Sequence, residues 1–217
     1  MKYLIGIDEA GRGPLAGPVA VGAVMLPADF DWSPLEGVKD SKKLSEKKRE
    51  ELFERTRELE RSSLLHVAVS TSSALYIDTY GIVPAIQSAL NRCLLKLSAS
   101  HSKGSPRIIR GLPLESFAKV CEVLLDGGLH APGEFIHQET IVGGDDTEPV
   151  ISLASIMAKV TRDRLMRRLA TRYPAYGFET HKGYGTPAHQ EAIRACGLSE
   201  IHRTSFCSRL QIGSSSV

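Results

Sequence analysis

The fold of this chain is decided near its beginning, by the stretch Ile5-Gly6-Ile7-Asp8-Glu9-Ala10-Gly11-Arg12-Gly13-Pro14-Leu15-Ala16-Gly17-Pro18. It places two adjacent carboxylates, Asp8 and Glu9, at the end of an apolar run that is typical of a buried strand. A Gly-Arg-Gly turn follows, whose glycines leave backbone N–H groups open to a sugar or a phosphate. Carboxylate oxygens suit hard divalent cations. The stretch therefore predicts a metal ion and a nucleic acid at one site.

Apolar runs further along the chain indicate how this first strand is covered. Short β-branched and apolar runs predict strands at 18–26, 66–71, 123–126 and 136–142. A possible capping residue, Ser45, followed by a run without Gly or Pro predicts a helix over 47–60. Apolar residues at helical spacing predict helices over 72–97 and 151–172, and a short helix is expected over 187–196. Strands that are apolar on both faces fit a sheet covered by helices. We therefore expect an α/β fold with the site along one edge of the sheet.

Charge and cysteine content restrict the class of protein. The net charge of the 217 residues is only +2, but residues 151–217 hold ten Lys and Arg against four Asp and Glu. This end could face phosphates, or it could be an ordinary solvated basic surface. Four widely spaced cysteines indicate neither a zinc site nor a disulfide framework. With no signal peptide and no apolar run of about 20 residues, we expect a cytoplasmic protein with no membrane partner.

Four carboxylates are candidates for the metal site. Asp8, Glu9 and Asp126 end predicted strands, and Asp145 lies in a glycine-flanked turn. Converging carboxylates repel one another, and two divalent cations such as Mg²⁺ would offset that repulsion. Two ions about 4 Å apart can activate a water and stabilise the leaving oxygen of a displacement at phosphorus. Taken singly, an Asp before Gly is more typical of a turn, and Asp-Glu could be a salt-bridged rim.

Five motifs in a fixed order identify the family that the chain resembles. They are Asp8-Glu9-Ala10-Gly11-Arg12-Gly13-Pro14, Asp40-Ser41-Lys42-Lys43-Leu44, residues 149–163, residues 173–186, and Ile201-His202-Arg203-Thr204-Ser205-Phe206. With them the chain resembles bacterial ribonuclease HII from about residue 3 to about residue 210. Ser98 to Lys119 matches nothing in that pattern and looks like an insertion.

The resemblance implies a fold, a reaction and a cofactor. The expected fold is an RNase H-like mixed sheet flanked by helices over residues 1–172, with a small C-terminal helical extension over 173–217 that contributes to substrate binding. The expected activity is endonucleolytic cleavage of RNA in RNA–DNA hybrids and on the 5′ side of ribonucleotides embedded in duplex DNA. Two Mg²⁺ or Mn²⁺ ions per site would support it, leaving 3′-hydroxyl and 5′-phosphate ends. A monomer is expected.

Residues are carried over only where they match the family's motifs. The four metal-binding acids would be Asp8, Glu9, Asp126 and Asp145. Asp8 would bridge both ions, Asp145 would hold the ion that activates the attacking water, and the other two would hold the ion at the leaving 3′ oxygen. Asp146 is the neighbouring alternative to Asp145, and the spacing to Pro149 favours Asp145.

Substrate contacts follow from the same resemblance. Gly11-Arg12-Gly13 resembles the family's reader of the ribose 2′-hydroxyl, the group that distinguishes RNA from DNA. Tyr184 matches the tyrosine that packs on the sugar beside the scissile phosphate; without the motif, a core aromatic would be the better interpretation. Phosphate contacts are expected from basic and hydroxyl side chains: Ser41, Lys42, Lys43, Lys159, Arg162, Lys182 and Arg203.

Two alternatives stay open at this point. One is a ribonuclease HIII-like hybrid nuclease, a family that lacks the Arg of Gly-Arg-Gly and usually has an added N-terminal domain. The other is a catalytically silent hybrid-binding protein, against which the four intact acids argue. The chain also departs from the ribonuclease HII pattern at Gly81 and Gly128, where Asn is usual, which puts local loop geometry in doubt.

Overall fold

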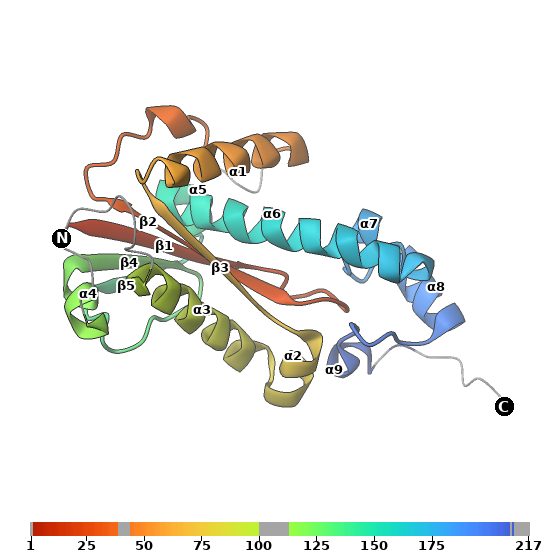
Figure 1. Cartoon of the computed structure of the whole chain (residues 1–217). Helices are drawn as coiled ribbons and strands as arrows, with labels where there is room; N and C mark the ends of the chain where they lie inside the picture. Colours follow the sequence, from red (N-terminus) through yellow and green to blue (C-terminus); the bar gives the residue numbers. More distant parts are fainter. Residues whose placement is uncertain (1, 39–43, 100–112, 209, 211–217) are drawn as a thin grey trace.

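The structure is a computed structural model that describes residues 2–38, 44–99, 113–208 and 210 (Figure 1). The strands are β1 (Tyr3–Ala10), β2 (Val19–Pro27), β3 (His66–Ser72), β4 (Cys121–Asp126) and β5 (Gln138–Ile141). The helices are α1 (Glu46–Arg61), α2 (Ala74–Tyr80), α3 (Ile82–Ala99), α4 (Leu114–Val120), α5 (Gly144–Thr147), α6 (Pro149–Arg172), α7 (Phe178–His181), α8 (Pro187–Cys196) and α9 (Thr204–Cys207), with 3-10 turns at Ser33–Leu35 and Pro174–Tyr176.

One five-stranded mixed sheet forms the centre of the fold, in the order β3-β2-β1-β4-β5. β1, β2 and β3 pair antiparallel, whereas β1 with β4 and β4 with β5 are parallel. The predicted α/β class, a mixed sheet flanked by helices, is confirmed. Because β1, β4 and β5 run in the same direction, their carboxyl ends lie at one edge of the sheet.

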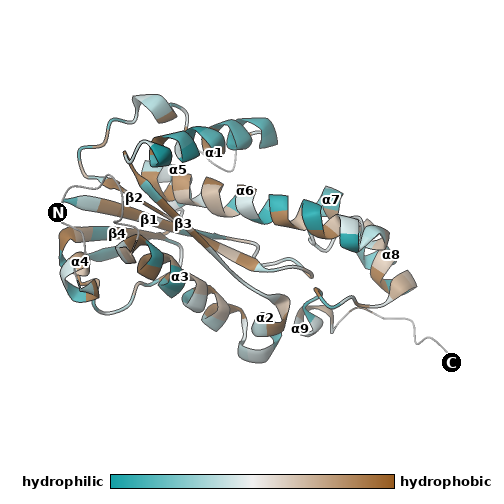
Figure 2. Ribbon diagram, in the orientation of Figure 1, coloured by the Kyte–Doolittle hydropathy of each residue, from teal (hydrophilic) through white to brown (hydrophobic). Residues whose placement is uncertain are grey.

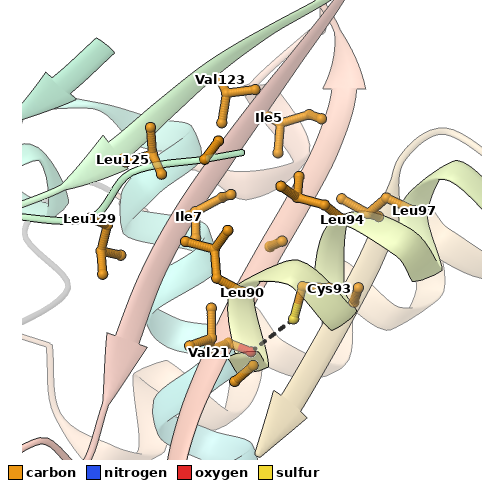
Figure 3. Close-up of a cluster of buried hydrophobic side chains, with 14 of the residues drawn as sticks. Ile5, Ile7, Val21, Leu90, Cys93, Leu94, Leu97, Val123, Leu125 and Leu129 are labelled. Carbon is orange, nitrogen blue, oxygen red and sulfur yellow. Dashed lines mark hydrogen bonds between the residues drawn. The ribbon is translucent and has the colours of Figure 1, made fainter. Parts of the chain in front are cut away.

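The two faces of β1 pack against different helices, because successive strand residues point to opposite sides. Ile5 and Ile7 are fully buried in a cluster that α3 completes (Figure 3). There the Cys93 thiol lies 3.3 Å from the Val21 carbonyl oxygen. The opposite face packs against α6 and α1, and only the inner stripe of α1 is apolar; Figure 2 shows this helix hydrophilic along most of its length.

α6 crosses β1 and β2 at very short range because glycines face it. A Cβ at Gly6 would lie 2.3 Å from the Val150 carbonyl oxygen, and one at Gly22 would lie 2.3 Å from that of Ala154. No side chain fits in that space, so both positions require glycine. Asp8 follows Gly6 on the same face of β1 and pairs with Gly22 in register. This first acid is therefore held beneath α6.

Some predicted boundaries were wrong. The helix expected over 72–97 is two helices, α2 and α3, because Gly81 adopts φ +90° between them. β1 continues beyond Ile7 because its pairing with β2 runs to Ala10 opposite Ala20, so Asp8 and Glu9 lie inside the strand. α4 was not predicted; it lies in the expected insertion, of which residues 100–112 are outside the described part of the chain.

The C-terminal helices pack around the end of α6 with an apolar cluster of their own, which includes Met166, Tyr176, Phe178, Ile193 and Cys207. Asp78 ties this region to α2, since its carboxylate accepts hydrogen bonds from the backbone N–H and hydroxyl of both Thr204 and Ser205. The boundary between residues 172 and 173 stays a prediction. In the described ranges no helix has the length and apolar character needed to cross a membrane.

Candidate functional site

The four predicted acids come from segments that meet at the carboxyl edge of the parallel strands. The parallel pairing of β1 with β4 ends at Ile7 opposite Leu125, so Asp8 and Asp126 each follow the last paired residue of adjacent strands. Asp145 lies in α5, which follows β5 directly. Neighbouring parallel strands thus bring together acids that are more than 100 residues apart in the chain.

Asp8 is the most deeply placed carboxylate on β1, with 5% of its surface exposed. Its Oδ1 accepts a hydrogen bond of 2.6 Å from the Glu9 backbone N–H, and the Ser155 hydroxyl of α6 donates a second one. Burial, together with the negative charges of Glu9 and Asp126, raises the pKa of Asp8 to about 8, although its two hydrogen bonds act in the opposite direction. The site therefore disfavours the ionised form of Asp8 while no cation is bound.

Asp145 and Asp126 form the second pair of acids. Asp145 is 1% exposed, and its backbone N–H donates a 3.3 Å hydrogen bond to Oδ1 of Asp126. Asp146 is exposed, and its N–H bonds the Gly143 carbonyl within the turn. Of the two neighbouring aspartates, Asp145 is the buried one, and its backbone N–H is the one that contacts Asp126.

The donor chemistry of this edge fits hard divalent cations, because every candidate ligand is a carboxylate oxygen. The raised pKa of Asp8 fits as well, since a bound cation would stabilise the ionised carboxylate against its burial and against the charges of Glu9 and Asp126. In the described part of the chain no three His, Cys, Asp or Glu side chains are already gathered into a metal-binding group. Instead the acids lie as two pairs, Asp8 with Glu9 and Asp126 with Asp145.

A cleft of about 500 Å³ opens beside the first pair of acids. Its walls come from β1, the Gly-Arg-Gly loop, α1, α6 and the segment before α8, through Glu9, Ala10, Gly11, Arg12, Gly13, Arg49, Ser155, Ile156, Lys159 and Tyr184. Three of these side chains are cationic and one is anionic, which suits a phosphate backbone. Six predicted site residues thus share one cleft.

Buried arginines hold the Gly-Arg-Gly loop from below. Arg203 donates to the carbonyls of Gly11, Arg12 and Gly17, at 2.7, 2.9 and 2.9 Å. Arg162 donates to Pro18 and Ala16 in the same loop, at 2.9 and 3.2 Å. Both guanidinium groups are 0% exposed, and neither makes an ion pair with a described carboxylate.

This placement corrects an expectation about phosphate contacts. The sequence predicts that Arg162 and Arg203 contact phosphate, but both lie inside the protein and bind backbone carbonyls instead. Among the described residues, Nη1 of Arg162 has no hydrogen-bond partner, and its Cζ lies 5.6 Å from the centre of the Tyr184 ring. The two arginines position the loop rather than contact a ligand from the surface.

Tyr184 stands at the mouth of the cleft and is 40% exposed, so the structure does not place it in the core. Lys159 also faces the ring, with Nζ 5.7 Å from its centre, and forms a 2.8 Å ion pair with Asp163. Lys182 is not among the cleft residues, because its ammonium donates to the Glu179 and Thr180 carbonyls. Ser41, Lys42 and Lys43 lie outside the described residues.

Two polar residues of the cleft, Arg49 and Ser155, were not predicted from the sequence. Arg49 lies in a run of alternating Lys and Glu on α1, where nothing distinguishes it from its neighbours. Ser155 lies one turn after Ser152 on α6, and only the packing of α6 over Asp8 gives it a role. Both become visible once α1 and α6 are placed on the same face of the sheet.

In protein freed of metal ions, the stabilisation associated with Asp8 should fall as the pH rises. Its folded-state pKa, about 8, lies above the unfolded value, so its contribution is complete below about pH 4 and is lost as the pH rises toward 8. Between about pH 5 and pH 8 the loss should be roughly 3–4 kcal/mol, a little under 1.36 kcal/mol for each of the three pH units. Urea unfolding in EDTA would measure it. Asp8→Asn, which cannot ionise, should lack the decline; an equal decline in both proteins would exclude Asp8 as its source.

Known proteins match this chain over nearly its whole length. The family model described as Ribonuclease HII matches residues 5–209. Ribonuclease HII of Endomicrobium trichonymphae is 44% identical over 201 residues, which are 93% of this chain and 83% of that protein. The solved PCNA:RNase HII complex from Archaeoglobus fulgidus is similar with a TM-score of 0.68 at 24% identity, over 99% of this chain and 98% of that one. The solved structure of Bst-RNase HIII in complex with Mn²⁺ is similar with a TM-score of 0.61 at 19% identity, over 90% of this chain and 63% of that one.

Proposed function

Because this chain belongs to the ribonuclease HII family, whose members are type 2 ribonuclease H endonucleases, we propose that it cuts duplex DNA on the 5′ side of an embedded ribonucleotide. The RNA strand of RNA–DNA hybrids would be its second substrate. The observation that carries the proposal is the shared cleft, which is lined by Gly11, Arg12 and Gly13, by Tyr184 and by Glu9. A group that reads ribose and an acid that can hold a metal ion are thus within reach of one nucleotide.

Asp8, Glu9, Asp126 and Asp145 would hold the two Mg²⁺ or Mn²⁺ ions. When bound, these ions supply an activated water and stabilise charge on the leaving 3′ oxygen. The protein contributes orientation: Ser155 and the Glu9 N–H fix the Asp8 carboxylate, and the Asp145 N–H fixes that of Asp126. Products with 3′-hydroxyl and 5′-phosphate ends follow from attack by water at phosphorus with loss of the 3′ oxygen.

The Gly-Arg-Gly loop would read the ribose through its backbone. Arg203 holds the carbonyls of Gly11 and Arg12 from inside the protein, which fixes the orientation of the loop's peptide groups before a substrate arrives. Arg12 itself is exposed at the cleft and pairs with Glu9 at 3.1 Å. A backbone fixed in advance adds selectivity for the 2′-hydroxyl without a loss of side-chain freedom on binding.

Ribonuclease HIII-like preference for long hybrids is the competing proposal. Arg12 argues against it, since that family is expected to lack this arginine, and Arg12 occupies the cleft here. A silent hybrid-binding protein would need neither the burial of Asp8 and Asp145 nor the hydrogen bond of the Asp145 N–H to Asp126. Localisation in the cytoplasm and a monomeric state remain proposals that stand on the family resemblance.

Cleavage of duplex DNA carrying one ribonucleotide, with Mg²⁺ or Mn²⁺, tests the function directly. We expect a single cut on the 5′ side of the ribonucleotide, and a Tyr184→Ala variant should reduce kcat at least about tenfold while changing Kd only slightly, because the ring orients the sugar. Comparison with the cleavage rate of an all-RNA/DNA hybrid of the same length shows which of the two substrates the protein prefers. Cutting of the hybrid alone would favour the HIII-like alternative, and no cutting of either duplex would leave only a binding protein.

A further inference from the structure

Three histidines of the C-terminal region form a connected group behind Tyr184. His189 of α8 and His202 are 0% and 3% exposed, and their Nε2 atoms lie 3.1 Å apart. His181 stacks on His189, with ring centres 4.4 Å apart. Phe178 contacts all three rings. Three adjacent imidazoles in one apolar cluster are unusual, because desolvation and mutual repulsion oppose the charging of His189 and His202.

The backbone partners of these rings fix where each proton lies. His189 Nδ1 is 2.9 Å from the Tyr184 carbonyl oxygen, which can only accept, so Nδ1 carries the proton and Nε2 is an acceptor. His202 must then donate from Nε2, which leaves its Nδ1 to accept from the Ser199 N–H at 2.9 Å and the Ser199 hydroxyl at 2.8 Å. The bonds form one directed chain from Ser199 to Tyr184.

The backbone partners of His181 fix its proton in the same way. Its Nδ1 accepts from the Gly183 N–H at 3.2 Å, and its Nε2 then donates to the Tyr176 carbonyl at 2.6 Å. Every imidazole nitrogen in the group therefore has a hydrogen-bond partner when the rings are neutral. Burial lowers the pKa of His189 and lowers that of His202 to about 4, so the neutral state is the one expected at physiological pH.

The histidine hydrogen bonds hold the segment Gly183–Tyr184, which carries the tyrosine that lines the cleft. His181 binds the N–H of Gly183, and His189 binds the carbonyl of Tyr184, one on each side of the peptide that joins the two residues. The Gly183 carbonyl accepts from the N–H groups of Leu15 and Ala16, just after the Gly-Arg-Gly loop. The segment is therefore fixed on three sides, and only the Tyr184 side chain projects to the cleft.

We propose that His189 is a positioning residue, whose Nδ1–H holds the Tyr184 carbonyl so that the Tyr184 ring faces the substrate, and that His202 fixes the tautomer of His189 that makes this bond. This inference rests on the proposed function of the cleft. The histidines contact no substrate atom; they act through the Tyr184 carbonyl. Loss of the hydrogen bond from His189 to the Tyr184 carbonyl should therefore remove the contribution of Tyr184 to cleavage, even though the tyrosine itself is intact.

Substitution by Asn or Gln separates the two contacts of His189. The amide nitrogen of Asn takes the place of Nδ1 and can keep the bond to the Tyr184 carbonyl, whereas the amide of Gln takes the place of Nε2 and can keep only the contact with His202. On duplex DNA with one ribonucleotide, His189→Gln should lower kcat/KM about tenfold or more, and His189→Asn should stay within about threefold of wild type. Thermal unfolding of both variants controls for folding. Equal losses in the two variants, or an unimpaired His189→Gln, would overturn the proposal.

A double-mutant cycle separates positioning from general loss of structure. If His189 acts through the tyrosine, His189→Gln should cost nothing further in a Tyr184→Ala background. The same fold-loss in both backgrounds would show an effect independent of Tyr184 and would contradict the proposal. Should the wild type not cut the single ribonucleotide, the proposed function fails, and the cycle is then run on the RNA–DNA hybrid.

Imidazole ¹⁵N NMR of the wild-type protein tests the direction of the histidine hydrogen bonds without any variant and without substrate. We expect His189 protonated at Nδ1 only and His202 protonated at Nε2 only, at neutral pH. The Nδ1 form is the minor tautomer of free histidine, so its presence would report the bond to the Tyr184 carbonyl. An Nε2-protonated or doubly protonated His189 would overturn the inference even if every variant failed to fold.

Discussion

Asp8→Asn should lower kcat for cleavage by at least about a thousandfold, the largest loss expected from any single substitution in this chain. Asp8 lies where the pairing of β1 with β4 ends, next to Glu9 and electrostatically coupled to Asp126. Asparagine keeps the size and one oxygen but removes the charge that a divalent cation needs. The same change removes a buried, repelled carboxylate, so the metal-free variant should fold at least as stably as wild type at pH 8.

Asp8→Asn is thus expected to lower cleavage without lowering the free energy of unfolding, and a variant that merely misfolds would not show this combination. Single-turnover cleavage at saturating Mn²⁺ measures the first, and urea unfolding in EDTA measures the second. Asp146→Asn is the matched control, because Asp146 is exposed and does not contact the other acids through its backbone N–H. Similar losses in both variants would mean that Asp146 shares the metal role; an active Asp8→Asn protein would remove Asp8 from the site.

Gly11→Ala should reduce both stability and cleavage, because glycine is required here for two separate reasons. Gly11 has φ +89°, where an L side chain is strained by about 1–3 kcal/mol. A Cβ would also lie 2.0 Å from Nε of Arg162, which is packed beneath the loop and cannot move without losing its bonds to Pro18 and Ala16. We expect a loss of stability of about 3 kcal/mol and at least about a hundredfold lower kcat/KM on the single ribonucleotide.

Gly13→Ala is the matched control for this substitution. Its φ is not positive, and an added Cβ would meet nothing within 4 Å in the protein. Its unfolding free energy should stay within about 0.5 kcal/mol of wild type. Any effect on cleavage would then come from the approach of the substrate to the loop. Gly11→Ala with wild-type stability would show that Arg162 and the loop can shift together, which would contradict the rigid support seen here.

Local features of this fold could be predicted because they depend on near neighbours in sequence. Strand composition identified β1 and β3, and helical spacing with a capping serine identified α1, where Ser45 accepts from the Lys48 N–H as a cap should. The break at Gly81 was harder to place, since the apolar spacing on its two sides continues in phase. The mixed sheet and the family came from motif order, and residue spacing alone would not have specified them.

The site was predictable only in part, for a physical reason. Carboxylates at strand ends and glycines in a turn carry their own signal, so Asp8 and Gly11 could be selected. The arginines could not be assigned correctly: a surface phosphate contact and a buried loop support have the same residue type and the same neighbours in sequence. Arg203 contacts Gly11 across 192 positions of the chain, and no local pattern reports such a pairing.

The bonds between Arg203 and the Gly-Arg-Gly loop have a consequence for the order in which the molecule becomes competent. Residues 11–17 are synthesised early, but the carbonyls of Gly11, Arg12 and Gly17 find their guanidinium partner only when Arg203 has been synthesised. Ala16 likewise bridges to His202. A growing chain can form its sheet while the Gly-Arg-Gly loop still lacks this support. Selectivity would thus be the last property that the nuclease acquires during its own synthesis, after the capacity to bind metal.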